Sequence, residues 1–378
     1  MIIKQHHYLD NAWKDYSSPL NSEKCQIVLA FGSPECILNP EIFQNLKSLY
    51  PNADIVFSST SGEILDDTVF DNSVVATAIE FEKTKIRSLQ TNVQQLKTSF
   101  ETGQFLMEQL SEEDLCCLFV IADGTQINGS ELVEGLNSKN KYNVPITGGL
   151  AGDADRFENT YTGLNDLPAQ GNVIAVGFYG KNIRIGSSSY GGWDEFGHER
   201  TITRSDKNML YEIDDKNALD LYKQYLGDYV NELPGSALLF PLSLRLQDSE
   251  DRLIRSVLNI NEGEKSMMFA GNLPEGSKVR LMKANFDKLI DASSDAATNL
   301  KAVNENTEPD LALLISCVGR KLILQDRTCE EVEAVKEIFG NKTIISGFYS
   351  YGEISPFDAD KPCGLHNQTM TITTFTEF

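Results

Sequence analysis

Residues 347–369, with the sequence GFYSYGEISPFDADKPCGLHNQT, bring several side chains that can do chemistry into one turn-rich stretch. His366 is one of only four histidines in the chain. A neutral imidazole beside a turn that contains glycine is suited to bind a metal ion or a haem iron. The alternative is a core histidine that is hydrogen-bonded to the backbone, and the residue types alone leave both interpretations open.

Further candidates for a ligand site lie in the same part of the chain. Cys317 and Arg320 end the apolar run LALLISCVGR, and ligands in open α/β sheets bind where parallel strands end. We expect Arg320 at a pocket rim with its guanidinium unpaired or bound to an anion, and a surface salt bridge is the alternative. Tyr349 and Tyr351 would stack on a flat ligand. Glu353 would orient that ligand or, as the alternative, tie down the turn.

The elements that must position these residues occur three times along the chain. An apolar strand, a helix, a second strand, a turn and a last strand follow one another in residues 25–81, 115–180 and 311–375. In the third copy, Thr328 and Glu331 fit a capping box at the start of the helix. Two strands joined by a helix pair in parallel, whereas the last strand can return antiparallel. The three segments are therefore predicted to share one topology.

Comparison of the three copies singles out the histidine. Asn72, Asn172 and Asn367 each stand shortly before the last strand, where asparagine is a favoured turn residue. If these asparagines are equivalent, the residue before them is an aspartate in the first copy, a glycine in the second and His366 in the third. The scaffold then does not require histidine at this position, which favours a role in ligand contact.

This organisation predicts an α/β protein of two related lobes, with mixed β-sheets covered by helices. Residues 1–24 form an N-terminal extension, residues 25–205 the first lobe, and residues 206–378 the second, ligand-binding lobe. The junction near Ser205 lies in a polar stretch, and no low-complexity linker separates the lobes.

The remaining histidines are weaker candidates for a site. His6 and His7 belong to the N-terminal extension and are expected to be solvated. His198 lies between the two lobes, where a surface role is expected.

Composition excludes several classes of function. A formal net charge of −22 argues against binding to nucleic acid or to an anionic membrane, because both require cationic contacts to phosphate. No apolar run approaches the ~20 residues that span a bilayer, and the N-terminus lacks the features of a signal peptide, so a cytoplasmic location is expected. Seven cysteines without a CxxC spacing are expected to be reduced thiols rather than zinc ligands.

The chain resembles the FIST family, whose paired FIST-N and FIST-C domains occur in signal-transduction proteins. The resemblance covers about residues 25–374 and is carried by GFYSYGEI, LHNQT, SCVGR, VPITGGLAGD and the long segment that ends in LYKQYLG. It implies a sensory fold that binds small molecules such as amino acids. The stand-alone members that it resembles bind haem, sense nitric oxide and regulate a separate histidine kinase or cyclic-di-GMP enzyme. Residues 57–59 read Phe-Ser-Ser instead of the family's glycine-cysteine-serine turn, which weighs against a ligand site in the first lobe.

Three functions remain open on this basis, and homo-oligomerisation also stays open. The first is a nitric oxide sensor without an output domain, in which His366 binds non-covalent haem, Arg320 pairs with a propionate, the tyrosines contact the ring and Asn367 fixes the turn. The second is a haem-free sensor of an amino acid or another small organic ligand. The third is an enzyme with His366 and Glu353 as acid and base and Cys317 as nucleophile. Because GxSxG, HExxH, Walker A and GxGxxG are absent from the sequence, we expect a sensor and not an enzyme.

Overall fold

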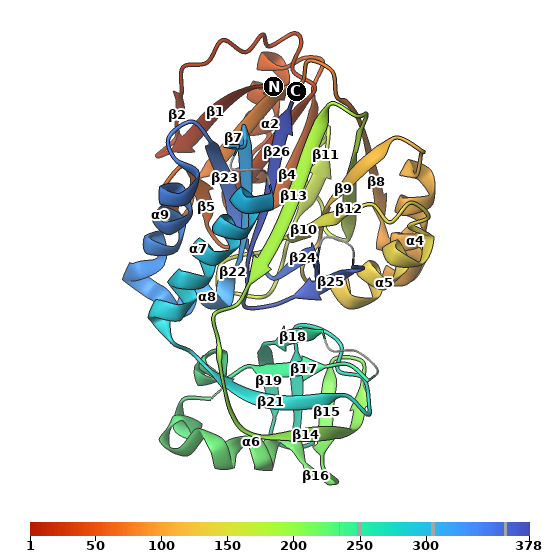
Figure 1. Ribbon diagram of the computed structural model, residues 1–378, viewed down its shortest axis with the longest axis vertical. Coiled ribbons are helices and arrows are strands. Elements are labelled where there is room, and N and C mark those ends of the chain that lie inside the picture. Colours follow the sequence, from red (N-terminus) through yellow and green to blue (C-terminus); the bar gives the residue numbers. More distant parts are fainter. Residues whose placement is uncertain (234, 248–250, 304–306, 359–360) are drawn as a thin grey trace.

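Three mixed sheets pack together, and a β-rich part formed by the middle of the chain lies beside them in the computed structural model (Figure 1). The two chain ends lie close together at the far end of the three sheets. The structure describes residues 1–233, 235–247, 251–303, 307–358 and 361–378. The predicted α/β class, with mixed sheets covered by helices, is confirmed.

The three repeats share one topology, as predicted. In each repeat the first strand pairs in parallel with the second and antiparallel with the last. All first strands are apolar runs with both faces covered, as is usual for parallel pairs. In chain order the strands are β3 (Ile27–Gly32), β4 (Asp54–Ser59) and β7 (Val74–Glu80); β9 (Leu115–Ala122), β10 (Ile146–Leu150) and β12 (Asn172–Tyr179); β22 (Leu311–Cys317), β23 (Ile344–Ser350) and β26 (Met370–Glu377).

Each repeat also lends the segment between its second and last strands to a neighbouring sheet. The first repeat adds β5 to β23, the second adds β11 to β4, and the third adds β24 to β10. The three sheets are thereby linked in a closed cycle, so no repeat completes its sheet alone. The exchanged strands are β5 (Glu63–Leu65), β6 (Thr68–Phe70), β11 (Thr162–Leu164), β24 (Gly352–Pro356) and β25 (Cys363–His366).

A fourth antiparallel strand extends each sheet beside the last strand of its repeat. The N-terminal residues supply one of them, which corrects the expectation that His6 and His7 are solvated. Pairing of their strand with β7 leaves His6 1% and His7 4% exposed, and the His6 ring makes a 2.6 Å hydrogen bond to Tyr50 Oη. The added strands are β1 (Ile2–Leu9), followed by β2 (Ala12–Asp15), β8 (Lys85–Asn92) and β13 (Ile183–Tyr190).

Helices cover the outer faces of the sheets, while apolar side chains from all three sheets meet in the centre. Phe31 and Phe348, from different repeats, have ring centroids 4.7 Å apart there. The helix that follows Asn39 shows why such a segment becomes a helix at this place. The Asn39 side chain caps it by accepting a hydrogen bond from Glu41 N, and its apolar residues Ile42 and Leu46 are buried against the sheet. The helices are α1 (Pro34–Ile37), α2 (Pro40–Leu49), α3 (Val93–Leu96), α4 (Ser99–Leu110), α5 (Gly129–Lys139), α7 (Phe286–Val303), α8 (Val318–Leu324), η3 (Gln325–Arg327) and α9 (Thr328–Phe339).

Residues 194–283 form the separate β-rich part, which we call the inserted β-domain (Figure 1). Ser205, the predicted junction of the lobes, lies inside its first strand, and a division of the chain there stays a prediction. Among the described residues, no helix is both long and apolar enough to cross a membrane. The elements of the inserted β-domain are β14 (Asp194–Asp206), β15 (Met209–Ile213), β16 (Lys216–Asn217), α6 (Ala218–Leu226), η1 (Gly227–Glu232), η2 (Gly235–Leu239), β17 (Leu242–Arg245), β18 (Arg252–Arg255), β19 (Val257–Asn261), β20 (Ser266–Phe269) and β21 (Lys278–Lys283).

Candidate functional site

Strand register identifies the true counterpart of His366 in the first repeat. Glu63 is paired with Phe70 in the β5–β6 hairpin, and Glu353 is paired with His366 in the β24–β25 hairpin. The counterpart of the histidine is therefore Phe70 and not Asp71, which corrects the alignment made from the sequence. The fold does not require histidine at this position, because the first repeat has a phenylalanine there, and a role of His366 in ligand contact stays a prediction.

The alignment was wrong because it matched residues by type instead of by backbone conformation. The residues that take the left-handed turn conformation are Asn72, Gly171 and Gln368, with φ values of 55°, 73° and 60°. Asn367 stands one residue before that position. Asparagine favours left-handed turns, but in the third repeat a glutamine takes this conformation.

The His366 side chain lies in the interior, 7% exposed. Its Nε2 makes a 3.0 Å hydrogen bond with the carbonyl of Ser355, and its ring packs edge-on against Phe357 at 5.2 Å. Burial, with a smaller contribution from the charge of Arg255, lowers the pKa of His366 to about 4. The imidazole is therefore neutral at physiological pH, and within the described residues its Nδ1 makes no hydrogen bond.

The expectation that Arg320 stands unpaired at a pocket rim is wrong. Its side chain is fully buried and forms an ion pair of 2.7 Å with Glu331. The guanidinium also donates to the carbonyls of Gly191 and Leu289, at 2.7 Å and 2.6 Å. Glu331 is not part of a capping box, because its carboxylate turns inward to neutralise the arginine. A buried charge requires such a partner, so Arg320 holds the fold together.

Tyr349, Tyr351 and Cys317 do not gather around His366. Tyr349 is fully buried and donates a 2.6 Å hydrogen bond to Glu331, on the Arg320 side of the third repeat. Tyr351 instead donates to Asp153 of the second repeat. Burial raises the pKa of the Cys317 thiol well above its usual range, which keeps it protonated and unreactive.

Glu353 ties down the turn, in agreement with the second of its two predicted roles. It accepts hydrogen bonds from Ser350 Oγ at 2.7 Å and from the amide and hydroxyl of Thr369 at 3.2 Å and 2.9 Å. Glu63 accepts from the amide and hydroxyl of Ser73 in the same way. Burial raises the pKa of Glu353 to about 8 and that of Glu63 to about 7.

A raised pKa makes the stability of the protein depend on pH through Glu353. The folded protein keeps the proton up to about pH 8, whereas an unfolded glutamate releases it near 4.5, so the stabilising contribution falls as pH rises between these values. At ~1.4 kcal/mol per pH unit, the wild type should lose about 2 kcal/mol more than Glu353→Gln between pH 6 and 8. Urea unfolding at each pH measures this, with the exposed Glu333→Gln as control. Parallel pH profiles for wild type and Glu353→Gln would contradict the prediction.

A cavity with a buried cation lies between α5, β25 and the inserted β-domain. Its volume is about 350 Å³, and Arg255 on its wall is 3% exposed. The guanidinium donates to the carbonyls of Leu365 at 2.9 Å and Asn272 at 3.1 Å, and no carboxylate of the described residues pairs with it. Burial lowers the pKa of Arg255 to about 10, so it remains charged at neutral pH. The lining residues are Ser130, Val133, Glu134, Asn137, Leu246, Leu253, Arg255, Asn272, Pro274, Phe357, Cys363, Gly364 and Leu365.

His366 stands directly behind the wall of this cavity. Phe357 contacts its ring and lines the cavity, and the carbonyl that Arg255 binds belongs to Leu365, its neighbour in the chain. Arg255 is not among the site residues predicted from the sequence. A signal was present, because alternation along β18 places Arg255 on the same face as the buried Leu253.

Family models match the chain over both the sheets and the inserted β-domain. The FIST N domain matches residues 26–216, and the FIST C domain matches residues 218–356. The chain belongs to the FIST family. FIST domains are sensory domains that bind small ligands. The uncharacterized protein MJ1623 of Methanocaldococcus jannaschii is 24% identical over 253 residues, which are 62% of this chain and 46% of that protein. The match thus spans about half the length of that relative.

The haem-binding set expected for this FIST protein does not assemble into one pocket. Arg320 and Tyr349 both donate hydrogen bonds to Glu331, and Tyr351 donates one to Asp153 of the second repeat. His366 has a ring nitrogen that makes no hydrogen bond within the described residues, and its ring contacts Phe357 of the Arg255 cavity, whereas Tyr351 lines a different cavity. The geometry fits a neutral imidazole ligand but not the predicted partners of the haem ring and propionates.

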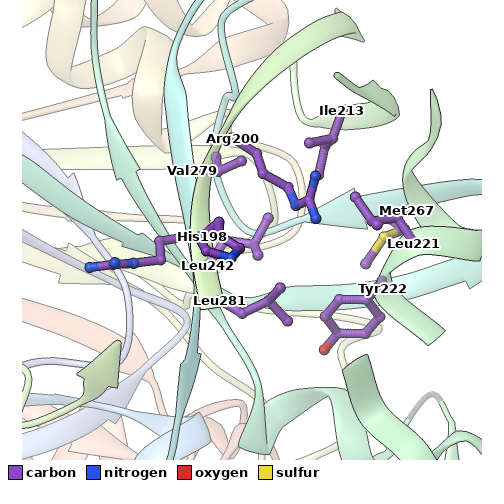
Figure 2. A pocket seen from close by; sticks show the side chains of 10 residues that line it. His198, Arg200, Ile213, Leu221, Tyr222, Leu242, Met267, Val279 and Leu281 are labelled. Carbon is purple, nitrogen blue, oxygen red and sulfur yellow. The ribbon is translucent and has the colours of Figure 1, made fainter. Parts of the chain in front are cut away.

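A smaller cavity inside the inserted β-domain of this FIST protein does not suit a ligand. Figure 2 shows Leu242, Met267 and Leu281 among the mostly apolar side chains that line it. Its volume of about 10 Å³ holds at most a single water molecule. His198, exposed as predicted, belongs to the same lining.

Proposed function

We propose that this FIST protein senses a small organic anion, which binds with its carboxylate on Arg255. The observation that carries the proposal is a buried guanidinium, 3% exposed, with which no carboxylate of the described residues pairs. Burying an unpaired charge is costly, and a bound anion removes that cost. Nε and Nη1 of Arg255 donate to the carbonyls of Asn272, Ile254 and Leu365, so Nη2 is the nitrogen that can donate to a carboxylate.

The rest of the cavity indicates the kind of anion. Its walls include the apolar side chains of Leu246, Leu253, Phe357 and Leu365, which suit an organic body with an apolar part. Its volume of about 350 Å³ lies within the range of small-molecule pockets, ~300–1,000 Å³. The lining also contains the carboxylate of Glu134, which suits the ammonium group of an amino acid. Amino acids with a modest apolar side chain therefore match this combination of one cation, one carboxylate and apolar walls.

The position of the cavity supports a route for the signal. Arg255 and Leu253 belong to the inserted β-domain, whereas Leu365 and Val133 belong to the three-sheet core. A ligand that contacts both parts favours the arrangement in which they are closed on it. We propose that the closed arrangement is read in the cytoplasm by a histidine kinase or a cyclic-di-GMP enzyme, as the family resemblance implies.

Isothermal titration calorimetry with amino acids and simple carboxylates tests the anion site. Arg255→Met should weaken binding of the active carboxylate about 10- to 100-fold, since a hydrogen bond to a charged group contributes ~1.5–3 kcal/mol. The matched control is Arg252→Met on the same strand, because that arginine is half exposed and pairs with Glu195. The amide analogue of the carboxylate should bind as weakly as the variant does. Equal affinities of Arg255→Met and wild type would contradict the proposal.

Haem-based nitric oxide sensing is the second candidate, favoured by the neutral His366 imidazole with an available Nδ1. On this proposal, His366→Ala abolishes the Soret band of protein supplied with haem, and nitric oxide shifts that band in the wild type. His198→Ala, which removes an exposed histidine, should leave the band unchanged. A Soret band that persists in His366→Ala, together with a lowered melting temperature, would make His366 a structural residue.

A further inference from the structure

We propose a second ligand site, separate from Arg255, that takes a neutral planar heteroaromatic molecule such as a nucleoside. It is a cavity of about 590 Å³ between the carboxyl end of β9, the start of α5 and strand β20 of the inserted β-domain. Asn272 divides it from the Arg255 cavity. The backbone N–H of Asn272 donates to Ser130 Oγ at 3.1 Å, and its side-chain Oδ1 accepts from Asn128 Nδ2 at 3.0 Å.

A rigid aromatic platform forms one wall of this cavity. The rings of Phe157 and Tyr351 are stacked at 4.5 Å with an interplanar angle of 19°. The Tyr351 hydroxyl donates to Asp153 and accepts a 3.0 Å hydrogen bond from the amide of Phe157, so both rings are held by the same bonds. Phe157 remains 38% exposed, which leaves ring surface open for a further aromatic group.

The backbone of Phe157 is strained in the conformation that exposes its ring to the cavity. Its φ of 55° is in the left-handed region, which bulky residues rarely adopt. Such strain persists only where surrounding contacts enforce it, and it concentrates at ligand sites. Here it presents a large apolar ring to a cavity instead of burying it.

The polar groups on the other walls determine the class of ligand. Thr125, Gln126 and Asn259 are neutral donors and acceptors, suited to the hydrogen-bonding edge of a heterocycle. The charged lining residue is Arg156, and it is already paired with Glu35 at 2.5 Å. A stacking surface with neutral hydrogen-bonding groups fits an uncharged purine better than an anion.

Titration with adenosine and guanosine, followed by saturation-transfer NMR, tests this site. Phe157→Gly removes the ring and suits the backbone, because glycine adopts a φ of 55° without strain. Loss of one stacked base typically weakens binding about 5- to 100-fold, and we expect that loss for the nucleoside that binds. Phe157→Tyr keeps the ring and should retain affinity, while Phe286→Ala removes an exposed ring elsewhere and should change nothing.

Arg255→Met separates this site from the anion site, because it should weaken carboxylate binding about 10- to 100-fold while leaving nucleoside binding intact. Absence of saturable binding by both adenosine and guanosine overturns the proposal. So does equal affinity of wild type and Phe157→Gly.

Discussion

Replacing Arg320 by methionine is expected to lower the free energy of unfolding by about 3–5 kcal/mol, because it leaves the Glu331 carboxylate buried without its cation. Both side chains are inaccessible to solvent, so water cannot replace the lost partner. The carbonyls of Gly191 and Leu289 lose their donors as well. Unfolding in urea, followed by circular dichroism, gives the difference.

Arg327→Met is the matched control for the Arg320 prediction. Arg327 also pairs with a carboxylate, that of Glu330 at 2.8 Å, but its side chain is 40% exposed. Exposed ion pairs contribute about 0–1 kcal/mol, so the control should remain close to wild type. A loss of less than ~1 kcal/mol in Arg320→Met would show that the buried pair is not needed for stability.

The second large effect is expected at Gly148, in the middle of β10. Its φ is +139°, and an added Cβ would lie 1.8 Å from the carbonyl oxygen of Val120 on the neighbouring strand. That oxygen belongs to the buried strand β9 and cannot move aside without disturbing the core. Gly148→Ala should therefore lower the free energy of unfolding by about 3–6 kcal/mol, combining backbone strain with overpacking.

Gly180→Ala separates the two causes in that prediction. Its φ is +110°, yet no atom of the described residues lies within 4 Å of the added Cβ, so only the backbone strain remains. We expect a loss of about 1–3 kcal/mol for this control. Thermal and urea unfolding of both variants gives the comparison, and equal losses would show that the contact with Val120 is relieved cheaply.

Local sequence patterns were sufficient to predict the α/β class of the fold and its threefold repeat. Apolar runs such as CQIVLAFG and LCCLFVIA form the central strands. A strand that is covered on both faces is apolar along its whole length, so a continuous apolar run is enough to predict it. Helix starts such as Asn39-Pro40 are equally local, since the capping side chain bonds an amide two residues away. The shared order of strands and helices in three segments followed from these signals.

The sequence by itself therefore determined the strand and helix order of the three repeats and the family, whereas the tertiary structure decided which polar groups are free. Arg320 and Arg255 are chemically alike in the sequence. Arg320 forms an ion pair with Glu331, eleven residues away in the chain. Arg255 donates a hydrogen bond to a carbonyl 110 residues away and pairs with no carboxylate of the described residues. The burial of His6 likewise depends on pairing with β7. These outcomes depend on contacts that form only when the strands and helices pack together, and no local pattern encodes them.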